Sequence, residues 1–348
     1  MQTFLLYGAT GYTGELLARE AARRGLRPLL AGRNATAVAA LANELELPWR
    51  AFALTDSAQL DAALREVSAV LHCAGPFVQT AAPMVAACLR TGRHYLDITG
   101  EIDVFETLAR QDTEAQAAGI MLLPGVGFDV VPSDCLALHL KSRLPTARQL
   151  TLAFQGLGAG VSHGTQATML LGAGAGGTVR RNGALIPVPA AWKTRAIDFG
   201  TGPRLAVTIP WGDVSTAFYS TGIPNIEVFM AVPPSAAALM KASRYLGRVL
   251  GSRPVQAFLH RRIPVGGPDA TQRAQGRMQL YGEATDATGQ QVVTRLIGPE
   301  GYTLTVLAAL HITEKVLRGD WQPGFQTPAK CYGAGLVLEL PGVVRKDE

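Results

Sequence analysis

The chain has 348 residues, and at roughly 150 residues per domain this length favours two domains. Hydrophobic residues make up 48% of the chain and charged residues 17%, so a large core is available and disorder is disfavoured. The net charge of +5 comes from scattered basic residues, with small clusters at residues 23–27 and 260–262. Because no stripe of basic residues interleaved with aromatic ones occurs, we expect no nucleic-acid partner.

The cysteine and histidine positions predict neither a metal site nor a disulfide framework. The six histidines are dispersed, and no two cysteines have metal-ligand spacing. The chain begins with an apolar run rather than a signal peptide, and no apolar stretch approaches the roughly 20 residues of a membrane span. We therefore expect a cytoplasmic protein without stable membrane insertion.

An apolar run at residues 4–7 leads directly into a glycine-rich loop, and residues 15–24 then show a helical pattern. Strand, glycine loop and helix form the first unit of a dinucleotide-binding fold. We expect Gly8 to permit the tight turn, Gly11 to let the backbone approach the pyrophosphate, and Gly14 to let helix and strand pack closely. The first gap holds two residues instead of the usual one, so the prediction rests on the position of the loop. The loop residues expected to contact the cofactor are Gly8, Ala9, Thr10, Gly11, Tyr12, Thr13 and Gly14.

A second predicted strand, at residues 28–31, ends next to Arg33 and Asn34, which we also expect at the cofactor. In an NAD-dependent fold, an acidic residue roughly 20 positions after the glycines would bind the ribose 2′-hydroxyl. Arg33 stands there instead, and its guanidinium suits a 2′-phosphate through charge-assisted hydrogen bonds. We therefore predict NADP(H) as the cofactor; the alternative role for Arg33 is an exposed residue at a strand end.

Four further strands are predicted at residues 51–54, 69–74, 94–97 and 120–123. They alternate with helices predicted at residues 36–46, 57–66, 83–91 and 104–118. Together with the first two strands they complete an α/β domain with a doubly wound parallel sheet of the Rossmann type. Ligands of such sheets bind beyond the carboxyl ends of the strands, so the loops there should lie along the cofactor.

The motifs GATGYTG, AGRN, HCAGPF, HYLDITGE and PGVGFDVVPSD occur in this order. Together they resemble the NADP-binding domain of the saccharopine dehydrogenase-like oxidoreductases, a group that includes saccharopine reductases and the trans-acting enoyl reductases of lipid biosynthesis. The resemblance is strong over residues 1–135 and moderate from residue 301 onward. It implies cofactor contacts for the glycine loop and Arg33, and it places three further loops around the nicotinamide end. The residues of those loops are Cys73, Ala74, Gly75, Pro76, Phe77, Thr99, Gly100, Gly127, Phe128 and Asp129.

After residue 130 the pattern predicts a second, α+β domain with a mostly antiparallel sheet. Strands are expected at residues 149–154, 205–209, 216–219, 227–231, 277–283 and 291–296, and helices at 131–144 and 235–260. The resemblance places a last helix, residues 302–318, back against the first domain. The expected organisation is an NAD(P)-binding domain at 1–130, a substrate or dimerisation domain at 131–300, and a returning helix and tail at 301–348.

The sequence offers no evident acid–base pair for catalysis. No tyrosine has a lysine four residues later, which disfavours the short-chain dehydrogenase mechanism, and no zinc ligand set is visible. A proton must still accompany hydride transfer to a double bond. The candidate donors are His163, Asp213 and Tyr219, followed by Asp129 and Asp97. The competing structural roles are a solvent-facing histidine at 163, an Asx turn at 213 and a core strand tyrosine at 219.

We therefore expect an NADPH-dependent reductase that transfers hydride to a C=C, C=N or C=O bond in a cleft between the domains. The many apolar residues of the second domain suggest a small or lipid-like, apolar substrate. A saccharopine-type imine or amino-acid dehydrogenase is the alternative among enzymes. The alternative from another class is a non-catalytic NADP(H)-binding sensor or lipid-associated protein. The candidate assembly is a homodimer.

Overall fold

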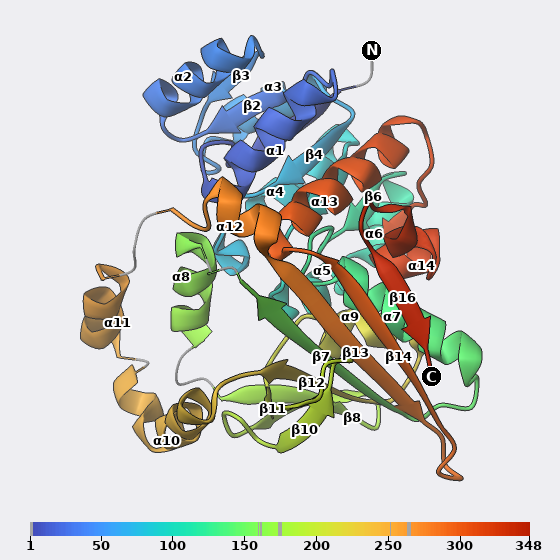
Figure 1. Ribbon diagram of the computed structural model, residues 1–348. Coiled ribbons are helices and arrows are strands. Elements are labelled where there is room, and N and C mark those ends of the chain that lie inside the picture. Colours follow the sequence, from blue (N-terminus) through green and yellow to red (C-terminus); the bar gives the residue numbers. More distant parts are fainter. Residues whose placement is uncertain (1–2, 159, 161, 173–175, 251, 263–265) are drawn as a thin grey trace. The chain divides into compact units, whose positions relative to one another are not determined.

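The computed structural model describes residues 3–158, 160, 162–172, 176–250, 252–262 and 266–348 (Figure 1). Its contacts divide the chain into two compact units. The first comprises Met1–Asp129 and Tyr302–Cys331, and the second comprises Val130–Gly301 and Tyr332–Glu348. The C-terminal part of the chain therefore contributes to both units.

The first unit is built on a seven-stranded parallel sheet. Its strands, in spatial order, are β15 (Gly324–Phe325), β6 (Met121–Leu123), β5 (His94–Asp97), β4 (Ala69–His72), β1 (Phe4–Tyr7), β2 (Leu29–Gly32) and β3 (Trp49–Ala51). The central strands β1, β2 and β4 are buried along their whole length, which requires helices on both faces of the sheet. The strand order reverses between β1 and β4, the place where ligands bind in such sheets. The predicted doubly wound Rossmann sheet is confirmed.

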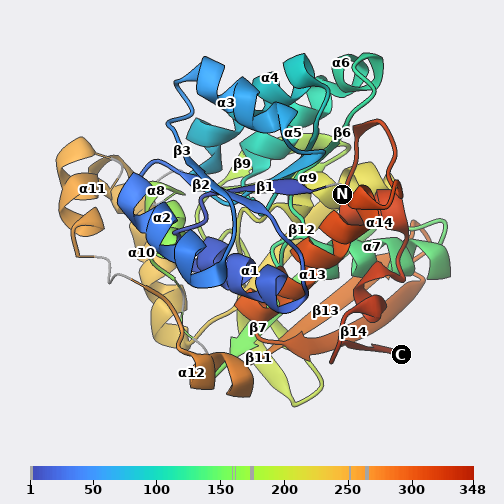
Figure 2. The ribbon, with the colours of Figure 1, turned by 90° about the horizontal axis from the view of Figure 1, so that it is seen from above.

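Helices cover both faces of this sheet, with α1 and α2 on one side and α3, α4 and α5 on the other (Figures 1 and 2). The helices of the first unit are α1 (Tyr12–Arg23), α2 (Ala35–Leu45), α3 (Ser57–Arg65), α4 (Phe77–Thr91), α5 (Ile102–Arg110), α6 (Asp112–Ala117), α13 (Gly301–Leu317) and α14 (Pro328–Tyr332). The returning helix α13 is fixed to this unit because Thr305 Oγ1 accepts a hydrogen bond of 3.0 Å from the Phe128 N–H. The rings of Tyr12 and Tyr302 also meet edge to face, 5.0 Å apart.

Three predictions for the first unit were wrong in detail. Helix α4 begins at Phe77, six residues before the predicted start, so Pro83 lies inside the helix rather than in its first turn. The predicted helix at 104–118 is two helices, α5 and α6, separated at Gln111. The strand predicted at 51–54 is β3, Trp49–Ala51. In each case the element is present, and its ends are set by contacts outside the local pattern.

The second unit is built on a nine-stranded mixed sheet. Its main path runs β10 (Thr194–Asp198), β11 (Pro203–Thr208), β12 (Asn225–Ala231), β7 (Gln149–Leu157), β13 (Arg277–Thr285), β14 (Gln291–Pro299) and β16 (Val344–Asp347), and β8 (Gly177–Arg181) and β9 (Ala184–Val188) branch from β12. Strands β7 and β12 pair in parallel, whereas β13 pairs antiparallel with both β7 and β14. The prediction of a second domain with a mostly antiparallel sheet is confirmed. The parallel pair of β7 and β12 makes that sheet a mixed one.

The helices of the second unit are α7 (Val131–Arg143), α8 (His163–Gly172), α9 (Asp213–Thr221), α10 (Pro234–Leu250), α11 (Arg253–His260), α12 (Ala270–Gln275) and the 3₁₀ helix η1 (Leu336–Glu339). The strand predicted at 216–219 was wrong, because these residues lie in α9. Gly222 ends α9 in the left-handed conformation, with φ 69°, and Ser220 Oγ donates to Asp134 on α7 over 2.5 Å. Tertiary packing thus outweighs the strand propensity of this stretch. The helix predicted at 235–260, in which Pro254 marked a candidate break, is α10 and α11, and α11 begins at Arg253 beside that proline.

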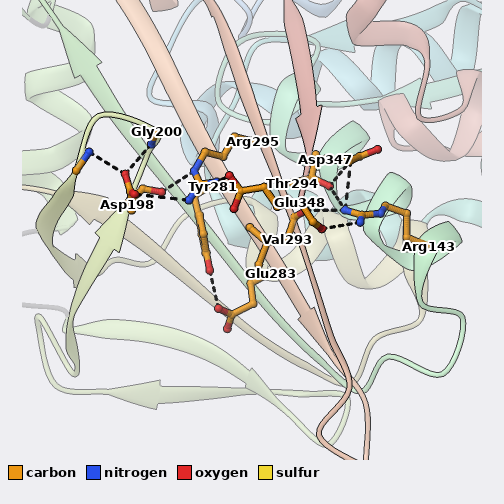
Figure 3. Close-up of polar contacts among 11 residues, drawn as sticks. Arg143, Asp198, Gly200, Tyr281, Glu283, Val293, Thr294, Arg295, Asp347 and Glu348 are labelled. Atoms are coloured by element: carbon orange, nitrogen blue, oxygen red, sulfur yellow. Dashed lines mark hydrogen bonds and ion pairs between the residues drawn. The ribbon is translucent and has the colours of Figure 1, made fainter.

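Polar side chains along β13 and β14 fasten the edge elements of the second sheet (Figure 3). Tyr281 Oη donates to Glu283 Oε2 over 2.6 Å, and Arg195 on β10 donates to the same carboxylate. Arg143 on α7 donates to Thr294 Oγ1 over 2.8 Å, while Thr294 donates to Asp347 on β16 over 2.6 Å. The first group of contacts links β10 to β13, and the second holds the last strand, β16, on the sheet.

Candidate functional site

The loop between β1 and α1 is a tight turn closed by backbone hydrogen bonds. Gly8 has φ +87° and its N–H donates to Ala31 O over 2.8 Å, and the Gly11 N–H donates to Gly8 O over 3.0 Å. Gly11 is the N-cap of α1 and offers no capping side chain. The first-turn N–H groups and the positive end of the helix dipole are therefore suited to an anion such as a diphosphate.

Two glycines of this turn are closely surrounded by backbone atoms. A Cβ atom on Gly14 would lie 2.1 Å from Gly8 O, and one on Gly8 would lie 2.7 Å from Ala74 N. Neither position has room for a side chain, because the obstructing atoms are backbone. The geometry agrees with the steric roles predicted for Gly8 and Gly14. The cofactor contacts of the loop stay a prediction.

The end of β2 presents an exposed arginine next to a helix cap. Asn34 Oδ1 accepts the Ala37 N–H over 3.1 Å, so its side chain caps α2. Burial raises the pKa of Tyr7 at the end of β1, and the nearby positive charge of Arg33 opposes this rise. Arg33 therefore lies close to the carboxyl end of β1 with its side chain exposed, where it can meet a ligand phosphate.

The loop after β4 continues directly into α4. A carboxylate from the loop after β5 caps the N-terminus of that helix. Glu101 accepts hydrogen bonds from the Phe77 N–H over 2.9 Å and the Val78 N–H over 2.8 Å. The Phe77 ring is buried and stands edge-on against His72. The described contacts of Glu101 are those of a helix cap, and the helix that it caps is α4.

Replacing Glu101 by alanine should lower the free energy of unfolding by about 1 kcal/mol, because two helix N–H groups lose a charged acceptor. Urea titration of the variant measures this change. The matched control is Glu44→Ala, which removes a carboxylate paired with Arg19 at the surface and should lower the free energy of unfolding by less than Glu101→Ala does. Equal losses in the two variants would contradict the capping role.

Asp97, at the end of β5, ties two loops together. Its Oδ1 accepts the Thr99 N–H over 3.0 Å and the Gly125 N–H over 2.8 Å, and its Oδ2 accepts Tyr95 Oη over 2.7 Å. Burial raises the pKa of Asp97 to about 6 although these hydrogen bonds oppose the shift. These contacts give Asp97 a positioning role for the loops that follow β5 and β6.

Asp129 lies at the same edge of the sheet, against the backbone of Gly100. Its Oδ2 is 2.7 Å from the place a Cβ on Gly100 would take, so glycine there gives the carboxyl group its position. Burial, and then the negative charge of Glu101, raise the pKa of Asp129 to about 7. Asp129 is predicted both as a cofactor contact and as a candidate proton donor, and a carboxyl group with a pKa of about 7 can donate or accept a proton near neutral pH.

His72 is fully buried among aromatic rings at the end of β4. Thr80 Oγ1 donates to Ala74 O over 2.6 Å, so its oxygen accepts from His72 Nε2, 3.0 Å away. This arrangement places the ring proton on Nε2. Burial lowers the pKa of His72 to about 3. His72 could not be singled out from the local pattern, because it follows three apolar residues at the end of a buried strand.

Stability should fall in acid because His72 is held neutral. The unfolded chain, with a histidine pKa near 6.5, binds more protons than the folded one between about pH 3 and 6.5. Above this window His72 is neutral in both states and does not reduce the stability. As the pH falls through the window, the free energy of unfolding decreases by at most about 1.4 kcal/mol per pH unit. His72→Phe should flatten that slope in urea unfolding measured between pH 7 and pH 4. Parallel curves for variant and wild type would refute the assignment.

The catalytic candidates of the second unit lie on two helices. His163 is the first residue of α8, and its N–H donates to Gly266 O over 2.8 Å. Asp213 begins α9 and is buried, and Tyr219 lies in the same helix rather than in the predicted strand. The Trp-Gly-Asp turn predicted at Asp213 is thus the start of a helix. Parts of the glycine-rich runs beside His163, residues 159 and 173–175, lie outside the described residues. The roles of these three side chains stay predictions.

Comparison with known proteins bears on the first unit most directly. Residues 4–123 match the family described as saccharopine dehydrogenase NADP binding domain. A putative trans-acting enoyl reductase of Mycobacterium tuberculosis is 35% identical over 182 residues, which cover 48% of this chain and 43% of that protein. The trans-acting enoyl reductase of Mycobacterium leprae is 35% identical over 149 residues, covering 40% of this chain and 35% of that protein. The matches thus span less than half the length of these relatives.

A solved structure resembles the whole chain. It is the apo histidine-tagged saccharopine dehydrogenase (L-Glu forming) from Saccharomyces cerevisiae, with a TM-score of 0.70, 12% sequence identity and coverage of 100% of both chains. At this identity the likeness shows the fold alone. Both units of this chain therefore have counterparts in the saccharopine dehydrogenase fold.

Proposed function

We propose that this chain, whose residues 4–123 form a saccharopine dehydrogenase NADP-binding domain, is an NADPH-dependent reductase. Its substrate is a small or lipid-like molecule with a C=C, C=N or C=O bond. The identity to trans-acting enoyl reductases favours C=C among these, and a saccharopine-type imine is the second candidate because of the shared fold. A cytoplasmic homodimer with an apolar substrate completes the proposal.

The observation that carries the proposal is the fit between the first unit and a 2′-phosphorylated dinucleotide. The turn at Gly8 and Gly14 leaves no room for a side chain, and the N-terminus of α1 opens onto that turn. Arg33 stands exposed at the end of the neighbouring strand, as recognition of an extra phosphate requires. Bound NADPH would supply the hydride, and the chain would supply binding, orientation and a proton.

Asp129 is the proton donor that this geometry favours. It lies at the carboxyl edge of the parallel sheet, where the reacting end of the cofactor is expected, and it retains its proton up to about pH 7. Glu101 and Asp97 would hold the surrounding loops through their backbone hydrogen bonds. His163, Asp213 and Tyr219 are the alternative donors, each on the second unit.

The test is oxidation of NADPH, followed at 340 nm, with enoyl thioesters, imines and ketones as separate substrate classes. We expect turnover with one class, falling as the pH rises above about 7, and a loss of about 100-fold in kcat for Asp129→Asn with NADPH affinity retained. The control Asp320→Asn changes an exposed carboxyl group paired with Lys315 and should leave kcat unaltered. Tight NADPH binding without oxidation by any class would instead identify a non-catalytic sensor.

A further inference from the structure

One segment of the second unit is strongly basic and contains no acidic residue. Between Val228 and Pro268 the sequence has neither Asp nor Glu. Its six basic residues are Lys241, Arg244, Arg248, Arg253, Arg261 and Arg262. The whole chain has a net charge of only +5, so this segment alone carries more positive charge than the sum over the entire protein. Its field favours an anionic partner.

Among the described residues of α10, within this segment, several exposed side chains are apolar. Leu239 is 73% exposed and Tyr245 is 91% exposed, and Ala238 and Ala242 are exposed as well. Positions 238, 242 and 245 are spaced by four and three residues, so they share one face of the helix. Ala237, on the other side, is buried. The outward side of the helix thus combines apolar side chains with the exposed Lys241, which lies three residues after Ala238 and four before Tyr245.

Two further aromatic side chains lie exposed on elements next to α10. Arg244 donates to Ala190 O over 2.6 Å and thereby ties α10 to the loop that carries Trp192, which is 44% exposed. On α11, Phe258 is 55% exposed, and the Arg262 guanidinium lies over its ring at 4.5 Å from the centroid. Aromatic rings beside basic side chains are typical of groups that sit at a membrane–water boundary.

We propose that α10, α11 and Trp192 form a docking surface for a membrane rich in anionic lipids. The helix would lie flat, with Leu239 and Tyr245 among the acyl chains and the basic side chains at the phosphate level. Helix α10 has 17 residues and would cover about 25 Å of membrane surface. Within the described ranges no helix is both long and apolar enough to span a bilayer, which fits attachment at the surface.

A lipid surface suits this patch better than an acidic protein does. The apolar side chains protrude from a convex helix face, and partial insertion into a fluid interface buries them without a complementary groove. The positive charges are spread along the whole segment. Anionic headgroups satisfy such a distribution without a defined geometry. The proposal does not depend on reductase activity.

The experiment is co-sedimentation of the full chain with vesicles of phosphatidylcholine containing about one third phosphatidylglycerol. We expect binding that is lost with pure phosphatidylcholine and that weakens at least about tenfold when salt rises from about 0.05 to 0.5 M. Leu239→Ser combined with Tyr245→Ser should weaken binding about tenfold or more, with an unchanged melting temperature because both side chains are exposed. Neutralising Lys241, Arg261 and Arg262 to glutamine should weaken it by at least a similar factor.

Matched controls distinguish binding through this surface from nonspecific binding to the vesicles. Ile297→Ser with Val344→Ser removes two other exposed apolar side chains, which face each other on β14 and β16. Changing Arg50, Arg65 and Arg110 to glutamine removes three exposed charges from the first unit. Both controls should bind the vesicles like wild type. Absence of binding to anionic vesicles, equal weakening in the controls, or capture of an acidic protein through Tyr245 without lipid binding would overturn the proposal.

Discussion

Substituting alanine for Gly14 should abolish measurable NADPH binding and destabilise the first unit. The new methyl group would lie 2.1 Å from Gly8 O, so the start of α1 must move away from the turn. Overpacking of this kind costs roughly 1–3 kcal/mol, and the obstructing atom is backbone that cannot rotate aside. The displaced helix start would no longer point its N–H groups at the diphosphate. Urea unfolding and titration with NADPH measure the two effects.

Gly335→Ala is the matched control for this substitution. Nothing lies within 4 Å of a Cβ built on Gly335, and its φ of −81° suits any residue. Stability and NADPH affinity should both stay at the wild-type level in this variant. Full NADPH affinity in Gly14→Ala would show that the turn between β1 and α1 is not the diphosphate site.

Removing Arg33 should change the choice between the two pyridine coenzymes. Loss of charge-assisted hydrogen bonds to a 2′-phosphate, each worth about 1.5–3 kcal/mol, weakens NADPH binding by roughly 10- to 100-fold. NADH lacks that phosphate, so its Kd should change less than about twofold in Arg33→Ala. Binding titrations of both coenzymes with both proteins check this expectation.

Arg33→Lys and Arg50→Ala complete the comparison. Lysine keeps the charge but not the planar fork, so it should restore part of the NADPH affinity. Arg50 is exposed in the same unit and pairs with Glu66, and its removal should affect neither coenzyme. A parallel loss for NADPH and NADH in Arg33→Ala would mean that the arginine supports the fold rather than selecting the phosphate.

The parallel sheet could be predicted because its information is local. Strands such as β1 and β4 are short, mostly apolar runs, and the glycine loop after β1 signals a specific turn. The two-residue strand β15 could not be predicted in the same way, because it exists through its pairing with β6 and through Asp112, which accepts the Phe325 N–H over 2.7 Å. A partner more than 200 positions away leaves no trace in the local pattern.

The same distinction applies to the candidate site. The steric roles of Gly8 and Gly14 and the position of Arg33 at a strand end could be predicted from their places in the chain, since backbone proximity and strand ends are fixed by the fold class. The cap on α4 could not be predicted in this way. Glu101 lies in the loop after β5 and reaches the Phe77 N–H only in the folded chain. The start of α4 was misplaced for that reason. In α9, packing around Asp213 and Ser220 converted a stretch with strand propensity into a helix.

The central claim is that the first unit binds NADP(H) through the turn at Gly8 and Gly14 and the guanidinium of Arg33. Isothermal titration of the wild-type chain with NADPH, and separately with NADH, tests it most directly. The account predicts saturable heat with NADPH, at least about tenfold weaker binding of NADH, and no heat from NADPH with Gly14→Ala. Absence of heat with both coenzymes, or tighter binding of NADH, would contradict it.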